Sequence, residues 1–177
     1  DGIRDIGVTG VQTCALPISS QAVLMDTYRI SVAAAALSRD LRPALRRARD
    51  LGVRAVELDA RGGLEPEQVT QTGLRQIRKW LDDEGIAVSA VSFRTRGGYA
   101  DAERLEGRIA ATKSALELAH GLAAGLVLNH VGEIPPESSG PRWQLLVDVL
   151  GDIGAWGQRV GATLCVEAGR EIGRAHV

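Results

Sequence analysis

The stretch Leu126-Val-Leu-Asn-His-Val-Gly132 decides the fold. It is an uninterrupted apolar run that turns polar at its end, where Asn129, His130 and Glu133 stand. A Pro-Pro pair comes next, and a long amphipathic segment follows it. A run of this kind is typical of a buried parallel strand that delivers side chains to a site at its C-terminal end.

Four other segments repeat this plan along the chain. The expected strands span residues 28–35, 53–59, 86–93, 126–132 and 162–167, and the expected helices span residues 40–52, 74–85, 105–121 and 141–160. In the last helix, the spacing predicts a buried stripe of Trp143, Leu146, Val147, Leu150 and Val160. Five strands alternating with four helices predict an α/β fold with right-handed parallel crossovers.

Two architectures fit this order, an open doubly wound sheet and a truncated (β/α)8 TIM barrel. No Gly-rich phosphate fingerprint follows the first strand, which disfavours the doubly wound sheet. Polar residues collect at the strand C-termini, where barrels keep their active sites. A whole barrel takes roughly 250 residues. We therefore expect a partial barrel whose working site is incomplete, and whose open edge favours aggregation or a homo-oligomer.

Composition excludes several classes of function. The chain has 177 residues, of which 45% are hydrophobic and 24% charged, and a formal net charge of -1. This near-neutral charge gives no reason to expect nucleic acid or an anionic membrane as a partner. No apolar run is long enough to span a bilayer. With only Cys14 and Cys165, no disulfide framework is expected, and a reducing cytoplasm is the expected location.

Both ends of the sequence match translated sequencing adapters. Back-translation of residues 8–18 gives a common short-read adapter, and residues 171–177 give the same adapter on the other strand. We therefore expect residues 1–18 to be a disordered, adapter-derived artefact, residues 171–177 to be adapter-derived as well, and residues 19–170 to be the partial barrel domain.

The remaining sequence resembles the xylose isomerase-like TIM barrels, also described as sugar phosphate isomerases/epimerases. The resemblance rests on four motifs in order: Ala55-Val-Glu-Leu58, Ser89-Ala-Val-Ser92, Leu128-Asn-His-Val-Gly-Glu-Ile-Pro135 and Leu164-Cys-Val-Glu-Ala-Gly169. It implies a site with one or two divalent cations (Mg, Mn, Co or Zn) and a small sugar or polyol as substrate. It also implies isomerisation or epimerisation by proton transfer through an enediolate.

Six residues carry this expectation. Glu167 matches the family's strand-five glutamate, which implies a metal ligand that also moves a proton, and His130 is the second candidate ligand. The predicted substrate contacts are Glu57, Asn129, Arg94 and Arg96. Alternation along residues 53–59 turns Glu57 into the barrel, where it could instead form a structural pair with an arginine. Arg94 and Arg96 could clamp a phosphate or carboxylate, but a solvated basic turn is the favoured interpretation of the two residues.

Two other functions are left open. The first is an abasic-site endonuclease of the same superfamily, which would need further histidines on the third strand, where Ser92, Phe93 and Arg94 stand. The second is a non-catalytic or inactive truncated product.

Overall fold

The computed structural model describes residues 29–168. Its five strands form one parallel sheet in the order β1-β2-β3-β4-β5. They are β1 (Ser31–Ala33), β2 (Ala55–Asp59), β3 (Ala87–Ser92), β4 (Leu126–Gly132) and β5 (Thr163–Ala168). The helices are α2 (Ala34–Leu37), α3 (Leu41–Asp50), α4 (Gln71–Glu84), α5 (Leu105–Gly121) and α6 (Gly140–Val160). Predictions for residues 1–28 and 169–177 lie outside the described part.

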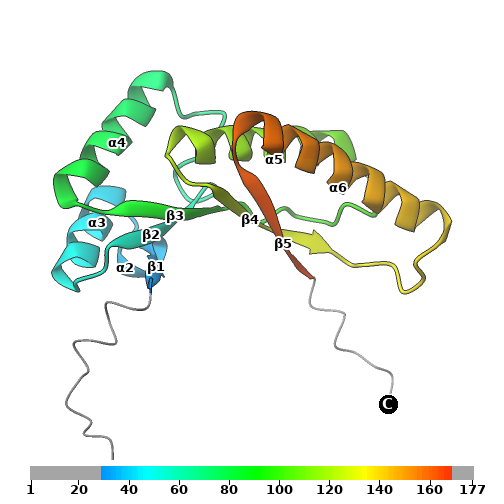
Figure 1. Cartoon of the computed structure of the whole chain (residues 1–177), viewed down its shortest axis with the longest axis horizontal. Coiled ribbons are helices and arrows are strands. Elements are labelled where there is room, and N and C mark those ends of the chain that lie inside the picture. Colours follow the sequence, from blue (N-terminus) through cyan, green and yellow to red (C-terminus); the bar gives the residue numbers. More distant parts are fainter. Residues whose placement is uncertain (1–28, 169–177) are drawn as a thin grey trace, which may run out of the picture.

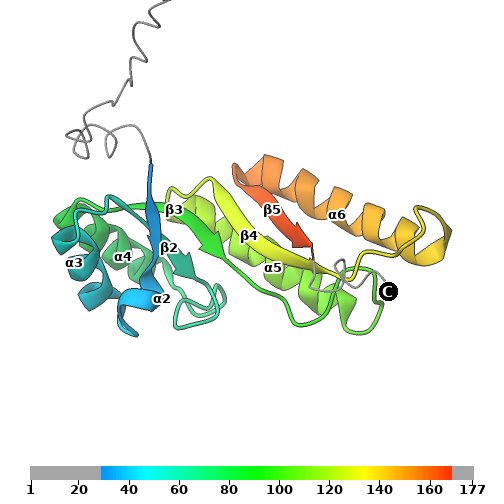
Figure 2. The ribbon, with the colours of Figure 1, turned by 90° about the horizontal axis from the view of Figure 1, so that it is seen from below.

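The strand order identifies the architecture. In a doubly wound sheet the order reverses at a switch point, whereas in a TIM barrel each strand lies beside its sequence neighbours. The observed order follows the sequence without reversal, so the α/β prediction and the partial TIM barrel are confirmed. Figures 1 and 2 show α4, α5 and α6 on one face of the sheet, while the strands lie in front of α5 in Figure 2.

The core lies between these helices and the sheet. Its strand members alternate along the sequence, as expected when one face of each strand meets a helix layer. The largest fully buried aliphatic side chains are Leu45, Val56, Leu58, Val91, Leu116, Val127, Val131 and Ile153. Among the described residues, none of the helices combines the length and apolarity that a bilayer crossing requires.

The sequence places most elements correctly but misses α2. The first strand was expected to continue to residue 35, but it ends at Ala33 and one helical turn follows. The segment Ala34–Leu37 is AAAL, and Ala and Leu have the highest intrinsic helix propensities. Residues 29–168 therefore contain five helices rather than the expected four.

The predicted stripe of α6 also needs correction. Val147 is 46% exposed, so the expectation that it is buried was wrong. The buried face instead runs through Leu146, Val149, Ile153 and Gly157. Gly157 allows close approach, because a Cβ at this position would lie 2.4 Å from the carbonyl oxygen of Ala162, the residue before β5.

Two bulges shift the strand registers. In β3 the partner of Val56 is Val88, but the partner of Glu57 is Ala90, so Ser89 is the extra residue. In β4 the pairing jumps in the same way from His130 to Gly132. A bulge changes which face the following side chains occupy and is common beside active sites. The bulge in β3 thus turns Val91 toward the helices, as Val88 is before it.

A backbone contact fixes the end of β4. Gly132 has a φ of 81°, in the left-handed region that favours glycine, and a Cβ at this position would lie 2.2 Å from the Cα of Gly98. The Tyr99 N–H donates to the carbonyl oxygen of Val131 over 3.1 Å. The loop between β3 and α5 is therefore pinned against the end of β4.

We expect Gly132→Ala to lower the free energy of unfolding by about 3 kcal/mol or more, because the methyl group meets backbone and the φ is strained. Urea denaturation of the full chain measures this change. The matched control is Gly151→Ala in α6, where a Cβ has no neighbour within 4 Å. It should gain about 0.4–1 kcal/mol. Equal stabilities for the two variants would show that the contact does not hold the loop.

Candidate functional site

The ends of β4 and β5 bring two predicted metal ligands together. His130 and Glu167 are Cα partners in the parallel register, so their side chains leave the sheet on the same face. The distance between His130 Nε2 and Glu167 Oε2 is 3.4 Å. The side chains are 34% and 55% exposed, which leaves both accessible to a bound cation or ligand.

A small inner pocket surrounds this pair. Its volume is about 40 Å³, and it is lined by Glu57, Ser92, Arg94, Leu128, Asn129, His130 and Glu167. An adjoining cavity of about 250 Å³ shares Glu57, Ser92 and Arg94 with it and adds Ala33, Ala35, Asp59 and Arg61. The C-terminal ends of all five strands therefore contribute to one polar mouth.

Glu57 reaches this mouth from β2 by alternation. Its neighbours Val56 and Leu58 are buried on the helix side, so the half-buried Glu57 side chain lies on the opposite face. No ion pair to Glu57 occurs among residues 29–168. A structural Glu–Arg pair, the alternative considered for this residue, is thus not observed in the described part of the chain.

Arg94 and Arg96, the two arginines of the basic turn, differ in their position relative to the two cavities. Arg94 lines both the inner pocket and the adjoining cavity. Arg96 is exposed and lines neither of them. Of these two arginines, Arg94 is therefore the one that shares both cavities with Glu57.

Asn129 lies differently from its neighbour His130. Its side chain is 1% exposed and is held by hydrogen bonds on the helix side. Asn129 Nδ2 donates to the Tyr99 hydroxyl over 2.9 Å, and the Thr95 hydroxyl donates to Asn129 Oδ1 over 3.2 Å. These contacts commit the polar atoms of Asn129 to the β3–α5 loop.

The buried network continues from Tyr99 into α5. The Tyr99 and Thr112 hydroxyl oxygens lie 2.7 Å apart, and Thr112 donates to the Arg108 carbonyl oxygen over 2.8 Å. Because the Thr112 proton is used there, Tyr99 is the donor in the pair. Burial raises the pKa of the Tyr99 phenol, and its hydrogen bonds oppose that rise. The phenol therefore stays protonated and keeps the chain of bonds intact.

Residues that sequence analysis missed also line the mouth. Asp59 follows Glu57 by two positions, and alternation places both on one face of β2, although the sequence alone did not single out Asp59 as a site residue. Ser92 lies beyond the β3 bulge, which hides its orientation from a pattern argument. Arg61 stacks on the Phe93 ring, 4.8 Å from the centroid, and the sequence holds no signal for this contact.

The donor set suits a divalent cation in part. A carboxylate and an imidazole on adjoining strand ends match the ligands of Mg²⁺, Mn²⁺ or Zn²⁺ sites. Within residues 29–168, however, no three His, Cys, Asp or Glu side chains lie close enough together to hold a metal ion. Glu167 and His130 therefore fit as part of a coordination shell rather than as a complete one.

Comparison with known sequences places this geometry in a family. The sequence profile of the xylose isomerase-like TIM barrels matches residues 45–173. The chain belongs to this family. No curated protein matches the sequence.

Solved structures show the same barrel. A xylose isomerase domain protein from Planctomyces limnophilus superposes with a TM-score of 0.68 at 24% identity, over 81% of this chain and 55% of that one. A D-psicose 3-epimerase solved in the presence of D-fructose gives 0.61 at 17% identity, over 77% and 51%. A xylose isomerase-like barrel from Mycobacterium smegmatis in complex with magnesium gives 0.60 at 19% identity, over 80% and 55%. This xylose isomerase-like chain thus spans about half the length of these structures.

We expect Glu57→Gln to change the free energy of unfolding by less than about 0.5 kcal/mol, because no ion pair in the described residues is lost. Urea denaturation measures this, with Leu58→Ala as the reference on the helix side of the same strand. That variant should lose about 2–5 kcal/mol. A loss above about 2 kcal/mol for Glu57→Gln would mean that its carboxylate stabilises the fold.

Proposed function

We propose that the chain carries part of the active site of a divalent-metal-dependent isomerase or epimerase that acts on a small sugar or polyol. The observation that carries the proposal is the 3.4 Å approach of His130 Nε2 to Glu167 Oε2 at adjoining strand ends. The family assignment and the fold shared with a D-psicose 3-epimerase support it.

In this proposal Glu167 has two roles. One carboxylate oxygen joins His130 Nε2 as a ligand of the cation, in a half-exposed position that still admits a substrate. The carboxylate would also take a proton from the carbon beside the substrate carbonyl and return it to the neighbouring carbon, whereas epimerisation needs a second carboxylate that delivers the proton to the other face. A divalent cation, when bound, polarises the substrate's carbonyl and hydroxyl oxygens and so acidifies the adjacent C–H.

The remaining residues of the mouth hold the substrate. Glu57 and Arg94 line both cavities and offer an acceptor and a donor for hydroxyl groups. Asn129 has a positioning role in this proposal, because its amide connects the end of β4 to the loop that carries Arg94. Arg96 lies outside both cavities, so in this proposal it is solvated and does not contact the substrate.

Manganese binding by the full 177-residue chain tests the proposal. We expect water-proton relaxation to detect a Mn²⁺ site, and Glu167→Gln to weaken binding at least about tenfold by removing a charged ligand oxygen. His130→Gln should act in the same direction. Glu117→Gln on the exposed face of α5 is the matched control and should bind like the unaltered chain. Unchanged affinity in the Glu167 variant would overturn the proposed site.

A further inference from the structure

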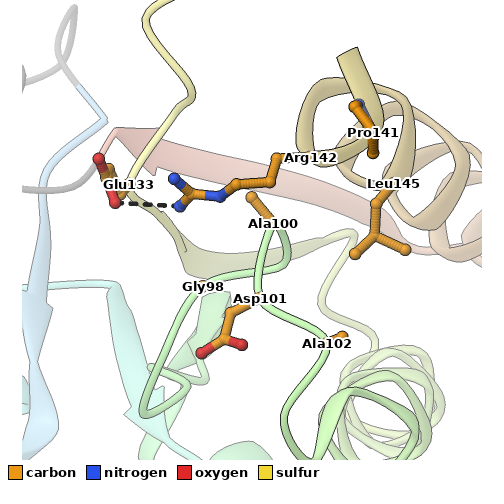
Figure 3. Close-up of a pocket in the computed structure, with 8 residues that line it drawn as sticks. All are labelled: Gly98, Ala100, Asp101, Ala102, Glu133, Pro141, Arg142 and Leu145. Carbon is orange, nitrogen blue, oxygen red and sulfur yellow. Dashed lines mark hydrogen bonds and ion pairs between the residues drawn. The ribbon is translucent and has the colours of Figure 1, made fainter.

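A larger cavity of about 500 Å³ lies beyond the end of β4. This outer cleft is lined by Gly98 and residues 100–102 of the loop, by Glu133 and by the first turns of α6 (Figure 3). It is separate from the inner pocket in its lining, but Glu133 is only three residues from His130. Its volume falls within the usual range for a small-molecule site, roughly 300–1,000 Å³.

The walls of the outer cleft are held in place before any ligand binds. Arg108 donates to the carbonyl oxygens of Asp101 and Glu103, which fixes the loop that forms one wall. Tyr99, fully buried within the same loop, joins it to β4. A wall that is already ordered loses little conformational entropy on binding.

The polar groups of the cleft suit hydroxyls. Arg142 Nη2 donates to Glu133 Oε2 over 3.1 Å, and the two side chains are 56% and 51% exposed. An exposed pair of this kind contributes roughly 0–1 kcal/mol, so its groups can take up ligand hydrogen bonds at little cost. A sugar hydroxyl both donates and accepts, so it can bridge a carboxylate and a guanidinium.

Asp101 adds a second acceptor. Its Oδ1 receives the Glu103 N–H over 3.0 Å, and Oδ2 has no hydrogen-bond partner within residues 29–168. Ala100, Ala102 and Leu145 add apolar surface to the lining. Carboxylates beside a small apolar surface match a ligand that alternates hydroxyl and C–H groups.

The charge of the cleft discriminates between ligands. Among the lining residues, two carboxylates, Asp101 and Glu133, stand against the guanidinium of Arg142, which is paired with Glu133. The Arg108 guanidinium lies in the wall, where its Nη groups are bonded to the carbonyl oxygens of Asp101 and Glu103. A phosphate dianion placed here would meet two like charges, whereas a neutral hydroxylated group would not. The lining therefore favours the unphosphorylated end of a substrate.

We propose that the outer cleft binds a neutral, polyhydroxylated part of a sugar or polyol and rejects a phosphorylated one. This inference rests on the proposed function and narrows its substrate class.

Saturation-transfer NMR on the full chain, with D-fructose as the probe, tests the inference. Asp101→Asn should weaken D-fructose binding about fivefold or more, because a charged acceptor is lost. The asparagine oxygen can still receive the Glu103 N–H, so the loop is preserved. Glu117→Gln is the control and should leave binding unchanged. Undiminished binding by the Asp101 variant would overturn the inference.

A second comparison tests the charge argument. D-fructose 6-phosphate should compete at least about fivefold less well than D-fructose for the unaltered chain. The double variant Asp101→Asn with Glu133→Gln removes both negative charges, and its affinity for the phosphate ester should rise about tenfold relative to D-fructose. Equal competition by the two sugars in the unaltered chain would overturn the inference.

The outcomes separate this inference from the proposed function. Normal Mn²⁺ binding together with an Asp101 variant that binds D-fructose normally contradicts the outer cleft alone. A Glu167 variant that binds Mn²⁺ normally, with the D-fructose response of Asp101→Asn as expected, contradicts the metal site alone.

Discussion

The packing of α4, α5 and α6 against one face of the parallel sheet is the constraint on which the site depends. Helices must cover the apolar side chains of β2, β3 and β4, and side chains alternate along each strand. The residues between the buried ones are then left on the opposite face. Glu57 and His130 reach the same mouth for this reason, although 73 positions separate them in the sequence.

Burial of the strand side chains that face the helices stabilises this arrangement. Fully burying a Val or Leu side chain contributes about 1.5–3 kcal/mol, and Val56, Leu58 and Val127 are almost completely buried. If a strand slipped by one residue in its register, these side chains would be exposed, and charged residues such as Glu57 would be buried in their place. Hydrophobic packing on the helix-covered face of the sheet therefore determines which polar side chains lie on the opposite face. Asn129 is a polar side chain that faces the helices. Because it is buried there, its amide needs hydrogen-bond partners, which Thr95 and Tyr99 provide.

The sequence predicts the strands of this fold well because each buried face has a clear period. The helices end where glycine adopts a positive φ, as at Gly85 and Gly161, and such ends are visible in the sequence. Predictions fail where a tertiary contact decides the outcome. Three such features are the bulge at Ser89, the left-handed conformation of Gly132 and its close contact with Gly98. They depend on neighbouring strands and loops, so no local sequence pattern predicts them.

The candidate site shows the same division. Alternation and family resemblance pointed to Glu57, His130 and Glu167, which line one pocket. Asn129 is predicted as a substrate contact from its place at the polar end of β4, and it lines the same pocket. Its side-chain amide is bonded to Thr95 and Tyr99. Tyr99 was not singled out, since its role comes from long-range hydrogen bonds to Thr112 and Asn129.

The central claim is that the ends of β4 and β5 together offer donors to one divalent cation. The most direct measurement is anomalous diffraction from crystals of the full chain grown with MnCl₂. We predict an anomalous peak within about 2.5 Å of both Glu167 and His130 Nε2. A fully occupied Mn²⁺ elsewhere on the molecule, with His130 and Glu167 carrying none, would contradict the account.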